Sequence, residues 1–500
     1  MGEQELKDLR DDIDKIDDRL FTLFEQRMRI VAKIAEQKRA AGLPVRVRAR
    51  EEELLARRRA QASEDMAAYA GDFAKALFSI SRRYQTAQTE KSLRCGLIGE
   101  RLSHSYSPAI HARLSAYDYR LFELQAGELE DFLSVGDFDG LNVTIPYKKA
   151  VIPFCRELTD IARRCGSVNT ICRRADGTLL GHNTDYEGFL FLLDRLGVRV
   201  AGKKALVLGS GGASATVCTA LRDRGAREIV VVSRQGENNY VNLYEKHADA
   251  QLLVNATPVG MYPETGRCLV SVDKLPALEA VADLIYHPAK TRLLLDAQRL
   301  GLPAMNGLTM LVAQAAASCE CFTGRRVDRR EIEALCREIE QETKNLLLIG
   351  MPGSGKSTIG AALAKTMDRP FVDSDERLEK LAGCSIPELI AAEGENAFRE
   401  REHEVLEELT KQSGMVIAVG GGAVLREDNI NLMRQNSTVI WLQRDLTALA
   451  VVGRPLSIKY GLDQLYAQRE PLYRKAAALT VDNNGGVSDC VERILEACYE

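Results

Sequence analysis

The segment Gly350–Thr358 reads GMPGSGKST and directly follows the apolar run Asn345–Ile349. Glycines at this spacing let the chain curl so that its backbone N–H groups point at phosphate oxygens. Lys356 would reach the β- and γ-phosphates, and the hydroxyl of Ser357 would be a ligand of Mg²⁺. The pattern predicts a nucleoside triphosphate site, whose expected contacts are Gly353, Ser354, Gly355, Lys356, Ser357 and Thr358.

Charged residues downstream of this loop are suited to a second substrate. The run Phe371–Asp375 ends in two carboxylates; one can hold Mg²⁺ through water, and the other can hold or deprotonate an acceptor hydroxyl. Arginines follow at Arg399, at Arg454 and in the segment Arg469–Arg474. Arginine suits a carboxylate-bearing acceptor and a transferring phosphoryl group. The loop alone does not say which molecule accepts the phosphate.

A second glycine-rich segment, Val207–Ser214, lies between a predicted strand and a predicted helix. Such a motif is weak by itself, but a further strand, Ile229–Val232, ends about twenty residues on. An acid after that strand would bind the ribose of NAD, whereas the neutral Ser233 followed by Arg234 suits the 2′-phosphate of NADP. The expected NADP contacts are Gly209, Ser210, Gly211, Gly212, Ala213, Ser233 and Arg234.

Small hydroxyl and amide side chains are concentrated before this motif, at loop positions suited to a polyhydroxylated acid. Their segments are Ser103–Pro108, Asn142–Lys148, Gly166–Thr170 and Asn183–Asp185. Lys148 and Asp185 are the titratable pair among them. An ammonium beside the reacting oxygen can give or take its proton, so these two residues are catalytic candidates.

The first ninety residues are predicted to be helical. Residues 4–41 contain no Gly or Pro, and apolar side chains recur there at steps of three and four, so one amphipathic helix of roughly 55 Å is expected. Two charged helices should follow, over about 48–63 and 66–87. A hairpin of this length cannot bury its own apolar stripe, which predicts a homodimer. Arg10 lies seventeen residues, or roughly 25 Å, before Arg27, so only a partner helix could bring it to the same pocket.

Composition supports a multidomain globular protein. A chain of 500 residues predicts roughly three domains, and a net charge of −4 argues against a general nucleic-acid binder. The twelve cysteines are scattered, without metal-site spacing, which favours reduced thiols and a cytoplasmic location. Neither a signal peptide nor a membrane partner is expected. From Leu93 short apolar runs alternate with helical stretches, which predicts α/β structure with largely parallel sheets.

Together the motifs of residues 345–500 resemble shikimate kinase. They include Phe398-Arg399, Gly420–Gly422, Gly453–Leu456 and Arg469–Arg474. The resemblance implies that Asp373 lies with Ser357 near Mg²⁺, and that Arg454 covers the nucleotide from a lid. It implies catalytic roles for Lys356, Asp375 and Arg454. The shikimate-binding residues that it implies are Asp375, Arg399, Gly421 and Arg469.

The ordered motifs of residues 93–325 resemble shikimate dehydrogenase. Further matching segments are Asn255–Met261, Tyr286–Pro288 and Asn306–Gln314. The resemblance implies that Lys148 and Asp185 are catalytic and that Gly260 contacts NADP. The substrate-binding residues that it implies are Ser105, Ser107, Thr144, Lys148, Asn169, Asp185, Tyr286 and Gln314.

Residues 3–88 resemble the all-helical chorismate mutases. Their reaction needs cations that clamp two carboxylates and a developing charge on an ether oxygen, without covalent chemistry. Val47 stands where the family often has an acid that contacts substrate. The implied chorismate-binding residues are Arg10 from the partner chain, Arg27, Lys38, Arg50, Glu51, Ser81 and Gln85.

These interpretations predict an all-α domain over 1–88, a two-lobed α/β domain over 93–343 and an α/β P-loop kinase domain over 344–500. The middle domain would comprise a substrate lobe (93–190), a Rossmann cofactor lobe (191–305) and closing helices (306–343). The expected activities are NADPH-dependent reduction of 3-dehydroshikimate, MgATP-dependent phosphorylation of shikimate, and conversion of chorismate to prephenate.

Three alternatives remain open. The helices could form only a dimerising or effector-binding module, the middle domain could prefer quinate and NAD, and the kinase could act on another small polyol.

Overall fold

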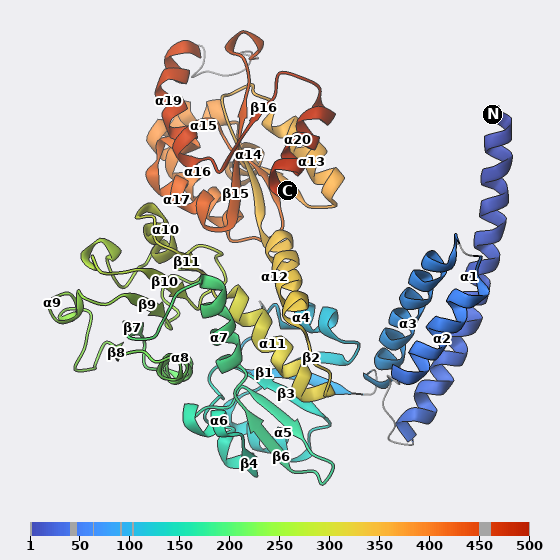
Figure 1. Ribbon diagram of the computed structural model, residues 1–500. Helices are drawn as coiled ribbons and strands as arrows, with labels where there is room; N and C mark the ends of the chain where they lie inside the picture. The colour runs from blue at the N-terminus through green and yellow to red at the C-terminus, as the bar shows by residue number, and fades with distance from the viewer. Residues whose placement is uncertain are drawn as a thin grey trace. The chain divides into compact units, whose positions relative to one another are not determined.

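The computed structural model describes residues 3–40, 48–63, 65–90, 93–102, 105–449 and 462–499 (Figure 1). These residues form two compact units, each described by itself. The first comprises Met1–Arg163, Ser167–Asn183 and Ala315–Val327. The second comprises Arg164–Gly166, Thr184–Gln314 and Asp328–Glu500. The predicted domain boundaries stay predictions.

Three helices build the N-terminal part of the first unit: α1 (Glu3–Ala40), α2 (Arg48–Gln61) and α3 (Ala67–Glu90). Helix α3 packs along both α1 and α2 (Figure 1). Only part of the α1 stripe is covered, because Met28, Val31 and Ala35 are buried whereas Ile16 and Leu23 are 62% and 61% exposed. The long helix expected from the apolar period is therefore present, with an apolar face that its own chain leaves exposed.

A six-stranded sheet forms the rest of the first unit, in the order β2-β1-β3-β5-β6-β4. The first three of these strands are parallel, but β5 pairs antiparallel with both β3 and β6. β4 pairs parallel with β6, so three of the five pairings are parallel and β5 is the exception to the expected pattern. Gly177, at a φ of +82°, makes a tight turn between β5 and β6, and strands so joined must be antiparallel. The strands are β1 (Arg94–Gly99), β2 (Asp118–Glu123), β3 (Gly140–Val143), β4 (Glu157–Leu158), β5 (Thr170–Arg173) and β6 (Leu179–His182).

The middle sheet, in the second unit, has the order β11-β10-β9-β7-β8 and is parallel throughout. Alternate side chains of β7 enter two cores: Ala205 and Val207 pack with helices α7 and α8, and Leu206 and Leu208 pack with α10. This double burial explains the continuous apolar run in the sequence. The elements are α7 (Asp185–Leu196), β7 (Lys204–Leu208), α8 (Gly212–Asp223), β8 (Glu228–Val232), α9 (Leu243–His247), β9 (Leu252–Asn255), β10 (Ala280–Asp283), α10 (Arg292–Arg299) and β11 (Ala304–Met305).

The C-terminal sheet has the order β13-β14-β12-β15-β16 and is also parallel. Leu346 and Leu348 of β12 pack with α13 and α20, whereas Leu347 and Ile349 pack on the opposite face. Helices therefore cover both faces (Figure 1). The strands are β12 (Asn345–Ile349), β13 (Phe371–Asp373), β14 (Val416–Ala418), β15 (Ser437–Gln443) and β16 (Leu479–Asp482). The helices are α13 (Lys356–Met367), α14 (Ser374–Ala382), α15 (Ile386–Glu393), α16 (Glu395–Thr410), α17 (Glu427–Asn436), α19 (Leu462–Ala476) and α20 (Val487–Tyr499).

Five further helices connect these layers: α4 (Ser107–Leu114), α5 (Leu129–Val135), α6 (Asp160–Cys165), α11 (Leu308–Thr323) and α12 (Arg329–Thr343). Asp328 caps α12 by accepting the N–H of Glu331, which fixes where this charged helix begins. In the part of the chain that the structure describes, no helix combines the length and the apolarity needed to cross a membrane.

Candidate functional sites

The glycine-rich loop lies at the carboxyl end of β12, directly before α13. Gly353 and Gly355 have φ values of +87° and +89°, which a side chain would disfavour. The ammonium of Lys356 folds back over the loop and donates to the carbonyls of Gly350 and Met351, both at 3.1 Å. The loop thus holds a cation next to the helix N-terminus, the arrangement that binds phosphate.

Two oxygen ligands suitable for a hard cation lie beside this loop. The Ser357 hydroxyl donates to Oδ2 of Asp373 at 2.6 Å, and Oδ1 of the same carboxylate accepts the N–H of Asp375 at 2.9 Å. Serine and aspartate oxygens are the donor type that Mg²⁺ prefers. The described residues contain no cluster of three His, Cys, Asp or Glu side chains that could hold a metal. A cation at Ser357 and Asp373 would therefore depend on nucleotide phosphates and water for further ligands.

Three neighbouring parallel strands bring the predicted acceptor residues to this loop. Asp373 pairs with Ala418, and Ala418 pairs with Leu348, so β13, β14 and β12 end side by side. Their carboxyl ends lead respectively to Asp375, to Gly420–Gly422 and to the phosphate loop. In parallel sheets ligands bind in the crevice at this edge.

The glycines after β14 lie directly against charged side chains. A methyl group on Gly420 would be 2.7 Å from Oδ1 of Asp375, and one on Gly422 would be 2.6 Å from the guanidinium of Arg399. A methyl on Gly421 would be 2.8 Å from Pro352 of the phosphate loop. Asp375, Arg399 and Gly421, which the sequence predicts to act together, are thus assembled beside the predicted nucleotide.

Glu402 is a member of this cluster that the sequence analysis missed. It is 3% exposed and accepts from Nη1 of Arg399 at 2.8 Å. Burial raises its pKa, and Arg399 opposes that change. Burial, with the charges of Asp373 and Glu402, also raises the pKa of Asp375 to about 7. The cluster therefore contains a carboxyl group whose pKa suits proton transfer near neutrality.

Arg469 is buried in α19 with 3% exposure. Its Nε–H has no hydrogen-bond partner among the described residues. Its charge acts on Glu402, and it contacts Tyr473, whose hydroxyl donates to the carbonyl of Gly421 at 2.6 Å. A carboxylate oxygen from a substrate would satisfy this donor. Arg454 lies outside the described residues.

Two further residues next to the phosphate loop were missed. A methyl group on Gly355 would be 3.0 Å from Nδ2 of Asn483 and 3.7 Å from Nη1 of Arg444. Asn483 donates to the carbonyl of Ser354 at 2.6 Å and so ties the loop to the end of β16. Arg444 comes one residue after β15, a position at the carboxyl edge of the sheet that could have drawn attention to it.

The second glycine-rich segment has the geometry of a dinucleotide-binding turn. Gly209 has a φ of +101° and donates its N–H to the carbonyl of Val232 at 2.8 Å, which holds the ends of β7 and β8 together. A methyl on Gly209 would be 2.8 Å from Thr257. Gly211 then caps α8, and Ser233 begins the turn after β8 with its N–H bound to Asn238. The predicted contacts Gly209, Ser210, Gly211, Gly212 and Ala213 therefore lie at the turn into α8, next to the carboxyl end of β8.

A buried network that the sequence did not reveal supports this lobe. Asp283, fully buried at the end of β10, accepts from Nδ2 of Asn255 at 3.0 Å and from the Thr291 hydroxyl at 2.6 Å. Burial raises the pKa of Asp283 to about 6. Gly260, with a φ of +101°, passes next to Thr291. The network fixes the Asn255–Met261 segment to β10 and α10.

The predicted dehydroshikimate-binding residues divide between the two compact units. Thr144 and Lys148 follow β3, whereas Ser107 and Asn169 are buried, the former at the start of α4. The backbone carbonyl of Lys148 accepts the N–H of Val168 at 2.8 Å, which fixes the main chain at this residue. These residues and Ser105 belong to the first unit; Asp185, Tyr286 and Gln314 belong to the second. Their joint site stays a prediction.

The helical domain assembles some of the predicted chorismate ligands. Arg27 donates to the Ser81 hydroxyl at 2.6 Å, and burial together with the charge of Arg58 lowers the pKa of Arg27. Arg58, a residue of α2, was not predicted. Its charge acts on Arg27, so it is a second cation near the predicted ligands. Glu51 pairs with Arg82 at 2.5 Å, and Gln85 is buried.

Other predicted ligands of this domain are not gathered at Arg27. Arg50 is exposed and pairs with Glu53 at 2.9 Å. Arg10 is exposed on α1, and Lys38 is half-buried near the end of that helix. Val47 lies outside the described residues.

Family models match four stretches of the chain. They are described as chorismate mutase type II (residues 9–86), shikimate dehydrogenase substrate binding domain (97–171), shikimate 5′-dehydrogenase C-terminal domain (307–337) and shikimate kinase (352–499).

Individual proteins are similar to the middle of the chain. Shikimate dehydrogenase (NADP(+)) of Clostridium beijerinckii is 35% identical over 267 residues, which are 50% of this chain and 98% of that protein. The enzyme of the same name from Methanopyrus kandleri is 39% identical over 260 residues, 46% of this chain and 89% of that protein. A crystal structure of a chorismate mutase/shikimate 5-dehydrogenase fusion protein from Clostridium acetobutylicum is 35% identical, with a TM-score of 0.47, and covers 49% of this chain and 96% of that one.

The folds and sites define a multidomain enzyme with two nucleotide-binding α/β sheets and a helical domain. Relatives above 30% identity match over nearly their whole length, so the chain belongs to the shikimate dehydrogenase family. It carries chorismate mutase and shikimate kinase domains on the same polypeptide and is a trifunctional shikimate-pathway enzyme.

Proposed function

We propose that the middle and C-terminal domains catalyse two consecutive steps, from 3-dehydroshikimate through shikimate to shikimate 3-phosphate. The observation that carries this proposal is the cluster of Asp375, Glu402 and Arg399 beside the phosphate loop. A buried carboxyl group, the half-buried Arg399 and the buried Arg469 suit an acceptor that has both a hydroxyl group and a carboxylate. Shikimate has both groups and is the product of the reaction expected from the preceding domain.

In the first step NADPH, when bound, supplies a hydride to the ketone carbon of 3-dehydroshikimate. The Lys148 ammonium donates its proton to the ketone oxygen, which becomes the hydroxyl of shikimate. Asp185 orients the substrate, together with the small polar side chains of the first lobe. Ser233 and Arg234 follow β8 at the position that discriminates NADP from NAD, and the similar enzymes are named as NADP(+) enzymes.

In the second step the shikimate hydroxyl attacks the γ-phosphorus of ATP, and Asp375 accepts its proton. Arg399 and Arg469 hold the substrate carboxylate, and Lys356 stabilises charge on the transferring phosphoryl group. Ser357 and Asp373 would hold Mg²⁺, which neutralises phosphate charge when bound.

The helical domain rearranges chorismate to prephenate as a homodimer. Arg27, Lys38 and their neighbours clamp the substrate carboxylates, and Arg10 comes from the partner chain. The exposed apolar residues of α1 supply the dimer contact.

The reduced state of the cysteines in the structure is compatible with the proposed cytoplasmic location.

A one-vessel assay tests the two-step proposal. The purified chain is given 3-dehydroshikimate, NADPH and MgATP, and we expect NADPH oxidation followed by shikimate 3-phosphate. The variant Lys356→Ala should oxidise NADPH normally and accumulate shikimate, because it loses only the phosphate-loop cation. NADPH oxidation by the unmodified chain without phosphorylated product would refute the kinase assignment, and absence of NADPH oxidation would refute the dehydrogenase assignment.

A further inference from the structure

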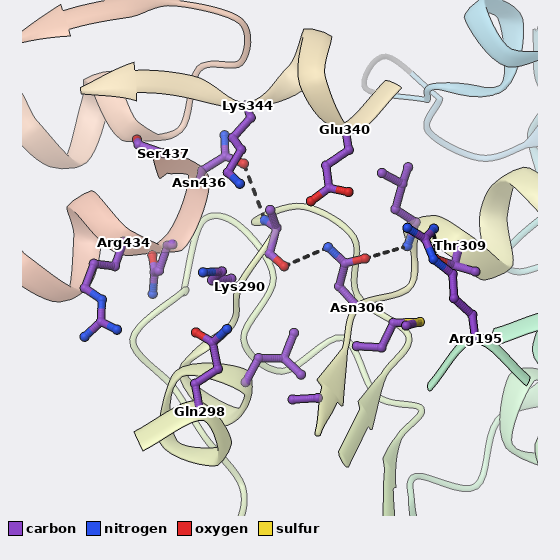
Figure 2. A pocket seen from close by; sticks show the side chains of 16 residues that line it. Arg195, Lys290, Gln298, Asn306, Thr309, Glu340, Lys344, Arg434, Asn436 and Ser437 are labelled. Carbon is purple, nitrogen blue, oxygen red and sulfur yellow. Dashed lines mark hydrogen bonds between the residues drawn. The ribbon is translucent and has the colours of Figure 1, made fainter. Parts of the chain in front are cut away.

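A cavity of about 250 Å³ lies between the middle and C-terminal sheets, where no site has been assigned above (Figure 2). Its wall includes α10, the loop after β10, the end of α12 and the end of α17. Every lining residue belongs to the second compact unit. The cavity is large enough for a small metabolite but below the usual range for a drug-sized ligand, roughly 300–1,000 Å³.

Positive charge dominates the lining. The lining has four cations and a single carboxylate, that of Glu340 (Figure 2). The cations are Arg195, Lys290, Lys344 and Arg434. Within the described part of the chain, none of these four cations forms a salt bridge. Burial and the charges of Lys344 and Arg434 lower the pKa of Lys290, whereas Glu340 raises it. Four positively charged side chains thus lie close together and partly buried. A bound anion would reduce the repulsion between them.

The negative ends of two helices offset only part of this positive charge. Arg434 is in the last turn of α17, and Lys344 follows α12, so each cation lies near a C-terminus carrying roughly half a negative charge. Two such ends and Glu340 together offset about two of the four positive charges. A surplus of about two remains, which matches the charge of a phosphate monoester near neutral pH.

The backbone that carries Lys290 is held in place from both sides. The Lys290 N–H donates to the carbonyl of Gln435 at 2.7 Å. The Asn306 amide donates to the carbonyl of Ala289 at 2.8 Å (Figure 2). The Ala289 N–H donates to Oδ1 of Asn436 at 3.4 Å. A preorganised cation loses less entropy when it binds a ligand than a mobile one does.

We propose that this cavity binds a small phosphate monoester through Lys290, Lys344 and Arg434, with Arg195 at its far side. Cations from the dehydrogenase cofactor lobe and from the kinase domain then bind the same doubly charged phosphate group. Binding therefore requires the two domains to be packed together. Arg195 is already oriented by its hydrogen bond to the Thr309 hydroxyl at 3.1 Å. The site is separate from the phosphate loop and from the NADP turn, and the proposal does not depend on the acceptor of the kinase.

Calorimetric titration of the full chain with glycerol 3-phosphate tests the proposal. Saturating NADP⁺ and MgADP are present throughout, so that both nucleotide sites are filled. The double variant Lys290→Gln/Arg434→Gln should bind at least tenfold more weakly than the unmodified chain. The charge-matched control Arg330→Gln/Lys365→Gln removes two exposed cations elsewhere and should bind normally.

Two further measurements keep the test decisive. Lys290→Met retains the apolar stem and removes only the charge, and it should melt no lower than the control while binding more weakly. Titration with glycerate, a hydroxylated carboxylate without phosphate, should give much weaker binding. The proposal is overturned if the unmodified chain does not bind glycerol 3-phosphate, if the cavity variants bind it normally, or if glycerate binds equally well.

Discussion

At the residue scale, the charged side chains proposed for the two reactions lie in separate parts of the structure. Lys148 follows β3 in one lobe, whereas Asp375, Arg399 and Arg469 gather at the edge of another sheet. In the proposed function each set serves one reaction, so substitutions should disable one activity and spare the others.

Lys148→Ala should lower dehydrogenase kcat by roughly 10²–10⁴-fold, the usual contribution of general acid–base catalysis. Shikimate phosphorylation should be unchanged. Initial rates of NADPH oxidation and of ADP release, measured on the same preparation, check both statements. The neighbouring Lys149 is exposed, so Lys149→Ala is the matched control. Equal losses in the two variants would argue against a proton-transfer role for Lys148.

Asp283 makes the stability of the cofactor lobe depend on pH. Burial raises its pKa from 3.8 to about 6, so the folded state binds the proton more tightly than the unfolded state. The stabilisation is complete below the unfolded pKa of 3.8 and is lost as pH rises to about 6, by roughly 3 kcal/mol at about 1.4 kcal/mol per pKa unit.

Asp283→Asn should flatten this dependence because it removes the titrating group. Thermal melts between about pH 4 and 7 measure it, and the cofactor-lobe transition is identified by its upward shift with NADP⁺. An unchanged slope in the variant would show that other groups cause the pH dependence.

At the element scale, the segment after β14 works through the absence of side chains. Gly420 and Gly422 leave space for the Asp375 carboxylate and the Arg399 guanidinium. The parallel order β13-β14-β12 then sets these groups beside the phosphate loop.

Gly422→Ala should move the Arg399 guanidinium, because the new methyl would lie 2.6 Å from it. Loss of a hydrogen bond to a charged group costs about 1.5–3 kcal/mol, so KM for shikimate should rise by roughly ten- to a hundredfold. KM for ATP should not change. Gly266→Ala, at a glycine with open space around it, is the control. An unchanged KM for shikimate would remove Arg399 from the acceptor site.

At the scale of the whole molecule, α1 carries an apolar surface that the described residues of its own chain leave exposed. Ile13, Ile16, Leu20 and Leu23 are between 42% and 62% exposed along one stripe. Burial of one such side chain stabilises by about 1.5–3 kcal/mol, so a paired stripe would hold a dimer firmly.

Ile16→Asp should convert the proposed dimer into a monomer and abolish mutase activity, since Arg10 would no longer reach the partner's site. Dehydrogenase and kinase rates should be retained. Light scattering coupled to size exclusion measures the mass, and Thr22→Asp, off the stripe on the same helix, is the control. An unmodified chain that is monomeric but rearranges chorismate would refute the dimeric site.

Features that depend on neighbours in the chain could be predicted from the sequence. The apolar period located α1, apolar runs located strands such as β8 and β12, and the glycine spacing located both nucleotide loops. Backbone conformation at these places is decided by adjacent residues. Asp375, Arg399 and Arg469 could be named through motif resemblance, but their meeting at one sheet edge could not be derived from spacing.

Contacts between distant residues were decided only by the tertiary structure. Glu402 joins Asp375, Asp283 joins Asn255 and Thr291, and Arg58 lies beside Arg27, each across an interval without a local signal. The cationic cavity likewise combines residues more than two hundred positions apart, from Arg195 to Arg434. Sheet order and side-chain burial determine which of these residues come into contact. Both are properties of the packed molecule rather than of any segment of the chain.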